Sequence, residues 1–223
     1  MEREAYHRNF FPLLVDSIVL LESAELERNP DLSNTLARSS IINSMLIPEV
    51  VANICVETLD LERSIFQEID KLSVLGKFDF FLRTTFRNRK IDRGISVVQG
   101  LQEIKKLRDG YVHPKKQKVI WVHSSEDEAT AEREESLLLK IATNSNFWHT
   151  ADAVAVMRGT HDFLYYFFHD CCRYSKKKVA SLLFSEEVVP DEESLTIPYL
   201  HKATRDLLNE WNVNVSYVKL GWL

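Results

Sequence analysis

The scarcity of residues that break helices limits the fold of this chain more than any other feature of its sequence. The 223 residues include only 6 Gly and 6 Pro, whereas a fold made of many short strands needs more of both in its turns. Hydrophobic residues make up 45% and charged residues 27%, which is typical of a globular protein and not of a disordered or fibrous one. A chain of this length buries enough surface to fold without a metal or a disulfide. We therefore expect one domain, or one domain with a substantial appendage.

Apolar residues recur at spacings of three and four along five segments, which is the pattern of helices that bury one face. Pro30 ends the first segment, Pro48 is expected to kink the second, and Pro114 follows the end of the fourth. Gly76 is a weak point within the third segment. The pattern predicts an all-α fold, an up-and-down helical bundle of four to five long helices, at residues 2–27, 32–56, 61–82, 93–111 and 150–173.

Two regions do not fit the helical pattern. We assign residues 1–173 to the bundle, with an insertion at about 115–146, and residues 174–223 to a small C-terminal α/β addition. Within the insertion, we expect a β-like run at 119–122, the start of an exposed acidic helix at 126–135 and a short apolar helix at 137–142. Within the addition, we expect an acidic loop at 188–198, a helix at 199–211 and a strand at 213–220. That strand is predicted to pair with 119–122 in a small ribbon.

Positive charge is concentrated in one part of an acidic chain. The net charge is −5, yet residues 83–118 contain eleven Lys or Arg and three acidic residues, a local net charge of +8 that leaves −13 elsewhere. A basic segment in an acidic protein is typical of a protein that binds a phosphate-bearing partner. The alternative is that these cations only keep exposed helix faces in solution, and composition alone favours that alternative.

Several kinds of site are excluded. The sequence contains no glycine-rich phosphate loop, CxxC pair, zinc-protease helix or nucleophile elbow. His149, His161 and His169 are twelve and eight residues apart, so they do not form the facing i, i+4 pair that metal sites on helices favour. Cys171 and Cys172 point to different sides of their helix, which favours buried thiols over nucleophiles. We expect neither a metal nor a cofactor.

The expected location is cytoplasmic. Three cysteines cannot form a regular disulfide framework, which favours a reducing compartment. Residues 1–9 carry charges of both signs and lack the apolar core of a secretory signal. The apolar stretch at 151–172 contains Asp152, Arg158 and Asp162, which would be costly in lipid, so we expect no membrane partner.

The most informative segment is Leu107-Arg-Asp-Gly-Tyr-Val-His113, at the end of the fourth predicted helix. The imidazole of His113 can exchange a proton near neutral pH, and Arg108 can hold phosphate oxygens in a fork. Asp109 can orient either side chain. Such a set permits RNA cleavage without a metal, by attack of a 2′-oxygen on its own phosphodiester. Helical geometry separates Arg108 and His113 by about 140°, so we expect a two-fold homodimer that brings two sets together. The alternative is a surface ion pair and a helix-ending histidine.

Neighbouring residues extend this candidate site. Lys105, and Lys106 beside it, precede the motif by one turn, and Lys115 and Lys116 follow it. Each is expected to contact RNA phosphates, in a manner that weakens steeply with salt. Tyr111 is expected either to stack on an unpaired base or to pack in an interface. The polar face of the fifth predicted helix, with Arg158, His161, Asp162 and Tyr165, either lines the same cleft or is solvated, and we favour solvation.

The chain resembles the HEPN superfamily, whose all-α bundles carry an R-x4–6-H motif at the end of a late helix. Arg108, Asp109 and His113 match that motif, although the commonest form has Asn where this chain has Asp109, and Gly110 lies inside the motif. The segments that begin at Ala37 and Glu49 are similar to the long early helices of the family. The resemblance implies a homodimer and a metal-independent endoribonuclease, of the kind found in toxin–antitoxin or antiviral systems. The alternatives are a non-catalytic module that binds RNA or a nucleotide, and a scaffold that binds a protein such as an antitoxin.

Overall fold

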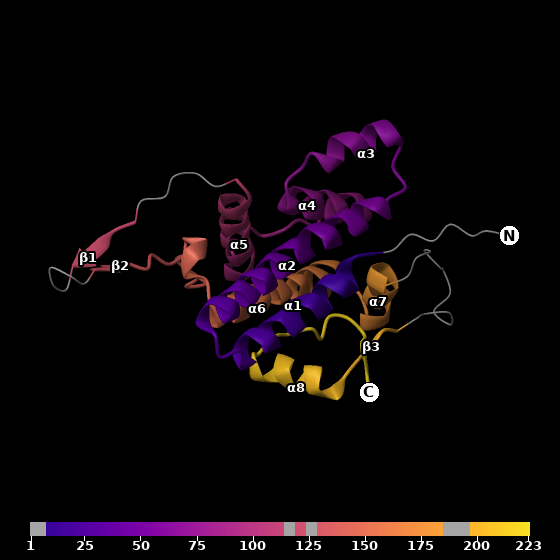
Figure 1. Cartoon of the computed structure of the whole chain (residues 1–223). Helices are drawn as coiled ribbons and strands as arrows, with labels where there is room; N and C mark the ends of the chain where they lie inside the picture. Colours follow the sequence, from indigo (N-terminus) through magenta and orange to yellow (C-terminus); the bar gives the residue numbers. More distant parts are fainter. Residues whose placement is uncertain (1–7, 114–118, 124–128, 185–196) are drawn as a thin grey trace.

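The computed structural model describes residues 8–113, 119–123, 129–184 and 197–223 of the chain (Figure 1). Most of these residues are helical, which confirms the all-α prediction. The helices, in chain order, are α1 (Phe10–Leu26), α2 (Pro30–Glu57), α3 (Arg63–Asp70), α4 (Val74–Thr85), α5 (Ser96–Val112), α6 (Thr150–Tyr165), α7 (Lys176–Phe184) and α8 (Lys202–Glu210). The short strands are β1 (Trp121–His123), β2 (Ala129–Ala131), β3 (Tyr199–Leu200) and β4 (Gly221–Trp222).

α1 and α2 form the central helix pair of the structure. The side chain of Asn29 caps α2 and Pro30 occupies its first turn, where a missing N–H is tolerated. The hydroxyl of Ser40 donates a hydrogen bond to the carbonyl of Ser17 at 2.7 Å, and both side chains are fully buried. These small, satisfied side chains allow the two helices to lie close together. Residues 2–7 of the first predicted helix lie outside the described residues.

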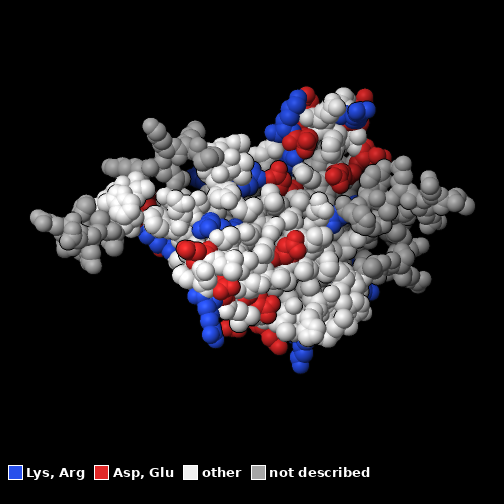
Figure 2. All heavy atoms as spheres, in the orientation of Figure 1, with Lys and Arg blue, Asp and Glu red and all other residues white. Residues whose placement is uncertain are grey.

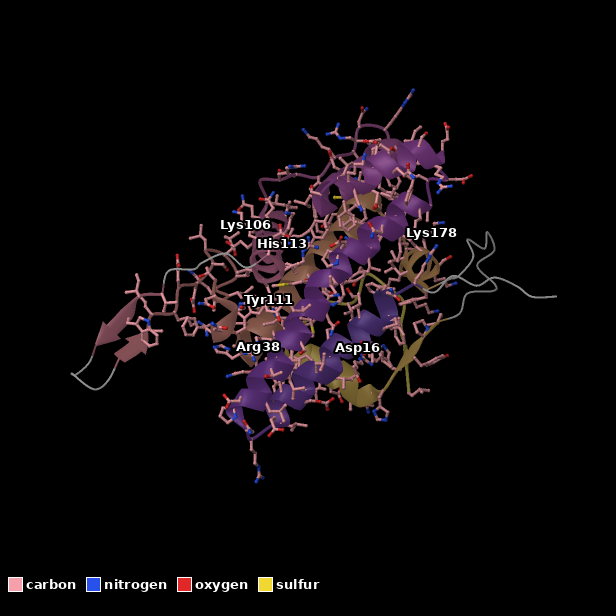
Figure 3. All side chains as sticks on the ribbon, turned by 45° about the horizontal axis from the view of Figure 1, so that its top comes forward. Asp16, Arg38, Lys106, Tyr111, His113 and Lys178 are labelled. Atoms are coloured by element: carbon pink, nitrogen blue, oxygen red, sulfur yellow. The ribbon has the colours of Figure 1, made fainter. Side chains whose placement is uncertain are left out.

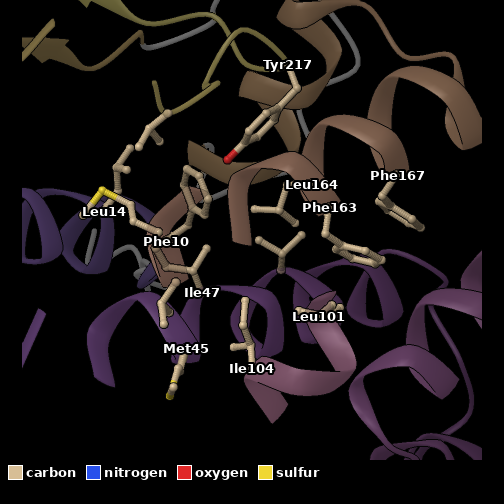
Figure 4. Close-up of a cluster of buried hydrophobic side chains, with 14 of the residues drawn as sticks. Phe10, Leu14, Met45, Ile47, Leu101, Ile104, Phe163, Leu164, Phe167 and Tyr217 are labelled. Atoms are coloured by element: carbon tan, nitrogen blue, oxygen red, sulfur yellow. The ribbon is translucent and has the colours of Figure 1, made fainter. Parts of the chain in front are cut away.

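α6 packs against α2, and α5 packs against α6, so the helix with the R-x4-H motif is attached to the core through α6 (Figure 1). Gly159 of α6 makes this contact close, because a Cβ there would lie 3.2 Å from Cδ1 of Ile104 on α5. Side chains from α1, α2, α5 and α6 meet in one buried cluster (Figure 4), which includes Phe10, Leu14, Ile47, Ile104, Phe163 and Leu164. The motif therefore sits on a firmly packed helix.

α2 continues through Pro48, which is buried inside it. Within the part of the chain that the structure describes, it is also the one helix long and apolar enough to cross a membrane, with a mean hydropathy of 1.5 over its most apolar 18 residues. Of the residues in this 18-residue segment, 61% are buried inside the protein. α2 contacts α1, α4 and α6. Burial of this kind is what the central helix of a helical core requires.

The third predicted helix, at 61–82, is two helices, and the prediction of one was wrong. α3 ends at Asp70 and α4 begins at Val74, and the Ser73 side chain caps α4 by accepting a hydrogen bond from the Gly76 N–H. The capping serine explains the break, because its side chain favours the start of a new helix over the continuation of an old one. Gly76, the predicted weak point, lies inside α4.

The fifth predicted helix has the expected length but not the expected surroundings. α6 continues from Tyr166 to Cys172 as a π-helical segment, and Arg173 ends it in a left-handed conformation with φ of 57°. His161, predicted on a solvated face, is fully buried, and its Nδ1 lies 2.8 Å from the hydroxyl of Tyr217. Arg158 donates a hydrogen bond to the carbonyl of Trp211 at 2.8 Å. The prediction that this polar face is solvated was wrong, because residues near the C-terminus, Trp211 and Tyr217, cover Arg158 and His161.

The strand pairing also differs from the prediction. β1 pairs with β2 in antiparallel register, and β3 pairs with β4 in parallel register, so the ribbon between 119–122 and 213–220 does not form. β1 meets a partner only a few residues away, and a short loop is less costly to close than a long one. The predicted helix at 199–211 is shorter, since α8 begins at Lys202 after a cap from the His201 side chain. Most of the predicted acidic loop, at 188–196, lies outside the described residues.

Residues 137–142 are not helical, although their apolar run predicted a helix. The carboxylate of Glu103 on α5 accepts hydrogen bonds from the backbone N–H groups of Leu138 and Leu139, at 2.9 and 3.0 Å. The N–H of Ala142 donates to the buried carboxylate of Asp152 on α6, at 3.0 Å. Carboxylates from two neighbouring helices therefore replace the hydrogen bonds that a helix would supply. Part of the predicted acidic helix at 126–135 is the strand β2, and residues 124–128 lie outside the described residues.

Candidate functional site

Arg108 lies in the last two turns of α5, and its side chain reaches α2. Nη1 donates a hydrogen bond to Glu49 of α2. Nη2 and Nε donate to Oδ1 of Asp109, at 3.0 and 3.3 Å. A guanidinium has five N–H donors, and two of them have no partner among the described residues. The side chain is 20% exposed, which leaves those donors partly within reach of solvent.

Asp109 connects Arg108 to a second cation. Its Oδ2 accepts a hydrogen bond from Nζ of Lys105 at 2.6 Å. Two carboxylates, from Glu49 and Asp109, therefore face two cations, from Lys105 and Arg108, and their formal charges cancel. Glu49, which the sequence analysis did not assign to the site, therefore offsets part of the positive charge of the basic segment at 83–118.

The two partners keep each other ionised. Burial opposes the charge on Arg108, but its hydrogen bonds to Asp109 and the negative charge of Glu49 together outweigh burial and raise the pKa of the guanidinium. Burial likewise opposes the charge on Asp109, but the hydrogen bonds from Lys105 and Arg108 outweigh it and lower the pKa of the carboxyl group. Arg108 and Asp109 therefore both remain charged at neutral pH.

His113 is the first residue after α5. Its backbone N–H donates to the carbonyl of Asp109 at 3.0 Å, which closes the helix. Its side chain is exposed, and no described residue forms a hydrogen bond or an ion pair with the imidazole. Figure 3 places His113 near Lys106, on the same outer end of α5. The imidazole is therefore accessible to a molecule that approaches this end.

Tyr111 combines packing and exposure. One face of its ring stacks on Trp148, with the ring centroids 5.5 Å apart and an angle of 24° between the planes. Trp148 is buried, and its Nε1 donates to the carbonyl of Ala142 at 2.7 Å. Tyr111 remains 43% exposed. An exposed aromatic ring held on one side can support an unpaired base, so both predicted roles of Tyr111 remain consistent with its position.

The structure brings together some of the predicted site residues and not others. Lys105, Arg108 and Asp109 form one hydrogen-bonded cluster, whereas His113 and Tyr111 lie on the outside of the same helix end. Lys115 and Lys116 lie outside the described residues. Sequence reasoning missed Glu49 and Trp148. Glu49 did carry a signal, since it is the only charged residue between Arg38 and Glu57, but nothing in the sequence linked Trp148 to Tyr111.

The surroundings of the cluster limit what it can bind. The cavity beside Arg108, between α2, α4 and α5, has a volume of about 20 Å³ and is lined mainly by apolar side chains. This volume admits a water molecule but not a nucleotide, so a substrate would bind on the surface at the end of α5. Among the described residues, no group of three or more His, Cys, Asp or Glu side chains is placed to hold a metal ion. On the face shown in Figure 2, cations and carboxylates are intermingled and form no continuous basic surface.

No family model, curated protein or solved structure matches this chain.

Proposed function

We propose that the protein is a HEPN-like, homodimeric endoribonuclease that cleaves RNA without a metal at the C-terminal end of α5. One observation carries this proposal. The exposed imidazole of His113, which has no partner among the described residues, and the fixed guanidinium of Arg108 belong to the same helix end, five residues apart. An imidazole can move a proton near neutral pH, and a guanidinium can hold phosphate oxygens.

The chemistry assigns a role to each group. His113 accepts the proton of a ribose 2′-hydroxyl, and the 2′-oxygen then attacks the adjacent phosphorus. The bond between phosphorus and the 5′-oxygen breaks, and a protonated His113 of the partner subunit donates the proton that the leaving oxygen needs. The products are a 2′,3′-cyclic phosphate and a 5′-hydroxyl. Arg108 donates its two remaining N–H groups to the phosphate oxygens, and Asp109 and Glu49 fix its orientation.

A dimer suits both the angular separation and the exposed surface. Ideal helical spacing separates Arg108 and His113 by about 140°, so a phosphate that contacts both is best held between two copies of the helix end. Tyr111 and Val112, directly before His113, are 43% and 55% exposed. Contact with a second copy would remove these apolar side chains from water. The cytoplasm, and a toxin–antitoxin or antiviral setting with an antitoxin as protein partner, belong to this proposal through the resemblance to HEPN proteins.

A second candidate is a HEPN-like module that binds RNA, a nucleotide or another protein without cleaving RNA. The ion pairs of Arg108 favour it, because Glu49 and Asp109 already satisfy three of the five guanidinium donors and cancel its charge. A phosphate would have to compete with both carboxylates. This candidate predicts retention of RNA or of a partner without new RNA ends.

One experiment separates the candidates. The purified protein is incubated with end-labelled RNA in the presence of a chelator, and both retention and cleavage are measured. We expect wild-type protein and His169→Ala, which removes another exposed histidine, to cleave RNA equally. His113→Ala is expected to lose roughly 10²–10⁴-fold in rate while its melting temperature and oligomeric state remain unchanged. Equal cleavage by His113→Ala and wild type would remove His113 from the mechanism.

A further inference from the structure

Residues of the C-terminal addition form the walls of an open cavity. The cavity has a volume of about 420 Å³ and lies between the start of α7, one side of α8 and residues 213–222. Binding sites for small molecules commonly occupy about 300–1,000 Å³. In Figure 1, α7 and α8 lie away from α5, so this cavity is separate from the R-x4-H motif.

The walls of the cavity are held in place by hydrogen bonds. The N–H of Lys219 donates to the carbonyl of Lys176 at 3.1 Å, which ties the C-terminal segment to α7. The carbonyl of Trp211, just after α8, accepts a hydrogen bond from Arg158 of α6. Val213 and Val218 of the segment are buried in the main core. The cavity is therefore a built part of the fold.

Three cations line this cavity, and no carboxylate side chain does. They are Lys176 at the start of α7, Arg205 on α8 and Lys219 on the C-terminal segment. None of the three forms an ion pair with a carboxylate elsewhere in the described ranges, and the guanidinium of Arg205 lies 5.8 Å from the ring centre of Trp222. Grouped cations repel one another, and this grouping occurs in a chain whose net charge is −5. An anion in the cavity would relieve that repulsion.

The rest of the lining is suited to an organic group. The indole of Trp222 provides a planar aromatic surface beside Arg205, and Leu208 and Val213 provide aliphatic contacts. The amides of Asn209 and Asn214 add hydrogen-bonding groups that can donate as well as accept. A ligand that uses the whole cavity would carry both phosphate charge and a flat, polar-edged ring.

We propose that this cavity is a nucleotide-binding site, in which Lys176, Arg205 and Lys219 hold the phosphates and Trp222 stacks on the base. The proposal does not depend on RNA cleavage at α5. Three cations match the charge of a nucleoside diphosphate better than that of a monophosphate.

Calorimetric titration of the full chain with ADP, in the presence of a chelator, tests the proposal. We expect ADP to bind at least ten times more tightly than either pyrophosphate or adenosine, because each of these fills only one part of the cavity. Arg205→Gln and Lys219→Gln are each expected to weaken ADP binding about ten-fold, the effect of losing one charged hydrogen-bonding partner. Lys202→Gln is the matched control, since it removes the same charge from α8 outside the cavity, and it should bind ADP as wild type does.

Other outcomes would overturn the proposal. They are the absence of ADP binding, affinities for ADP and pyrophosphate that are equal, and equal loss of affinity in Lys202→Gln and Arg205→Gln. Trp222→Leu separates stacking from charge, because it should weaken the binding of ADP and leave the binding of pyrophosphate unchanged. His113→Ala should retain full ADP affinity, and a loss there would place the ADP at the end of α5 instead.

Discussion

The buried imidazole of His161 should make the stability of the folded protein depend on pH. The side chain is fully buried beneath the C-terminal residues, with Nδ1 against Tyr217 and no hydrogen-bonding partner for Nε2 among the described residues. Burial lowers the pKa of His161 from its ordinary value of 6.5 to about 3. A protonated imidazole would have to place a second N–H without an acceptor, so the folded protein holds this ring neutral.

The direction and size of the effect follow from linkage. Between about pH 3 and pH 6.5 the unfolded chain binds a proton at His161 and the folded protein does not, so acidification favours unfolding. The stability that the neutral imidazole contributes is fully present above the pKa of His161 in the unfolded chain. It is lost as the pH falls toward the pKa of His161 in the folded protein. Between pH 7 and pH 5 the loss is about 2 kcal/mol, and any folded-state pKa below about 4 gives the same figure.

Urea denaturation at pH 7 and at pH 5 measures this loss. His161→Gln keeps an amide that can bond to the Tyr217 hydroxyl but does not titrate, so its free energy of unfolding should fall by about 2 kcal/mol less than that of wild type. His169→Gln, which replaces an exposed histidine, is the control and should follow wild type. The reasoning is refuted if wild type and His161→Gln lose equal stability over this interval.

Two further predictions concern the site and the core. Glu49→Gln removes one carboxylate from Arg108, so the affinity of the protein for RNA should rise several-fold and depend more steeply on salt. Fluorescence anisotropy at several salt concentrations measures this affinity. An unchanged affinity would show that Arg108 does not contact RNA. Phe163→Ala leaves a cavity at a fully buried position beside two other phenylalanines, so the free energy of unfolding measured with urea should fall by about 3–5 kcal/mol. Leu137→Ala changes a side chain that is 78% exposed, so it should lower the free energy of unfolding by less than about 0.5 kcal/mol.

The helical class and the positions of most helices could be predicted because they depend on local pattern. Apolar spacing located α2, α5, α6 and the end of α1 to within a few residues. The break between α3 and α4 depends on a capping serine, Ser73, inside an otherwise periodic segment. Residues 137–142 follow the helical pattern, but they are not helical because their backbone N–H groups donate hydrogen bonds to Glu103 and Asp152 of other helices. Tertiary hydrogen bonds of this kind have no local signature.

In the candidate site, too, the features set by local sequence could be predicted and those set by tertiary contacts could not. The sequence placed Arg108, Asp109 and His113 at a helix end, which is where they lie. It could not show that Glu49, more than fifty residues away, takes one of the guanidinium donors. It also misjudged His161, because a polar face on an isolated helix says nothing about a later segment that covers it. Local chemistry can be read from spacing, whereas the partners of each charge depend on packing between distant segments.

The chemical identity of the RNA ends tests the central claim most directly. A short RNA oligonucleotide is compared with an oligonucleotide of the same sequence that lacks 2′-hydroxyls. Each is incubated with the protein and a chelator, and the masses of the products are measured by mass spectrometry. We expect wild-type protein to cut only the RNA, leaving a 2′,3′-cyclic phosphate and a 5′-hydroxyl, and His113→Ala to leave both substrates intact. Products with a 5′-phosphate, or cleavage of the substrate without 2′-hydroxyls, would contradict attack by the 2′-oxygen at the end of α5.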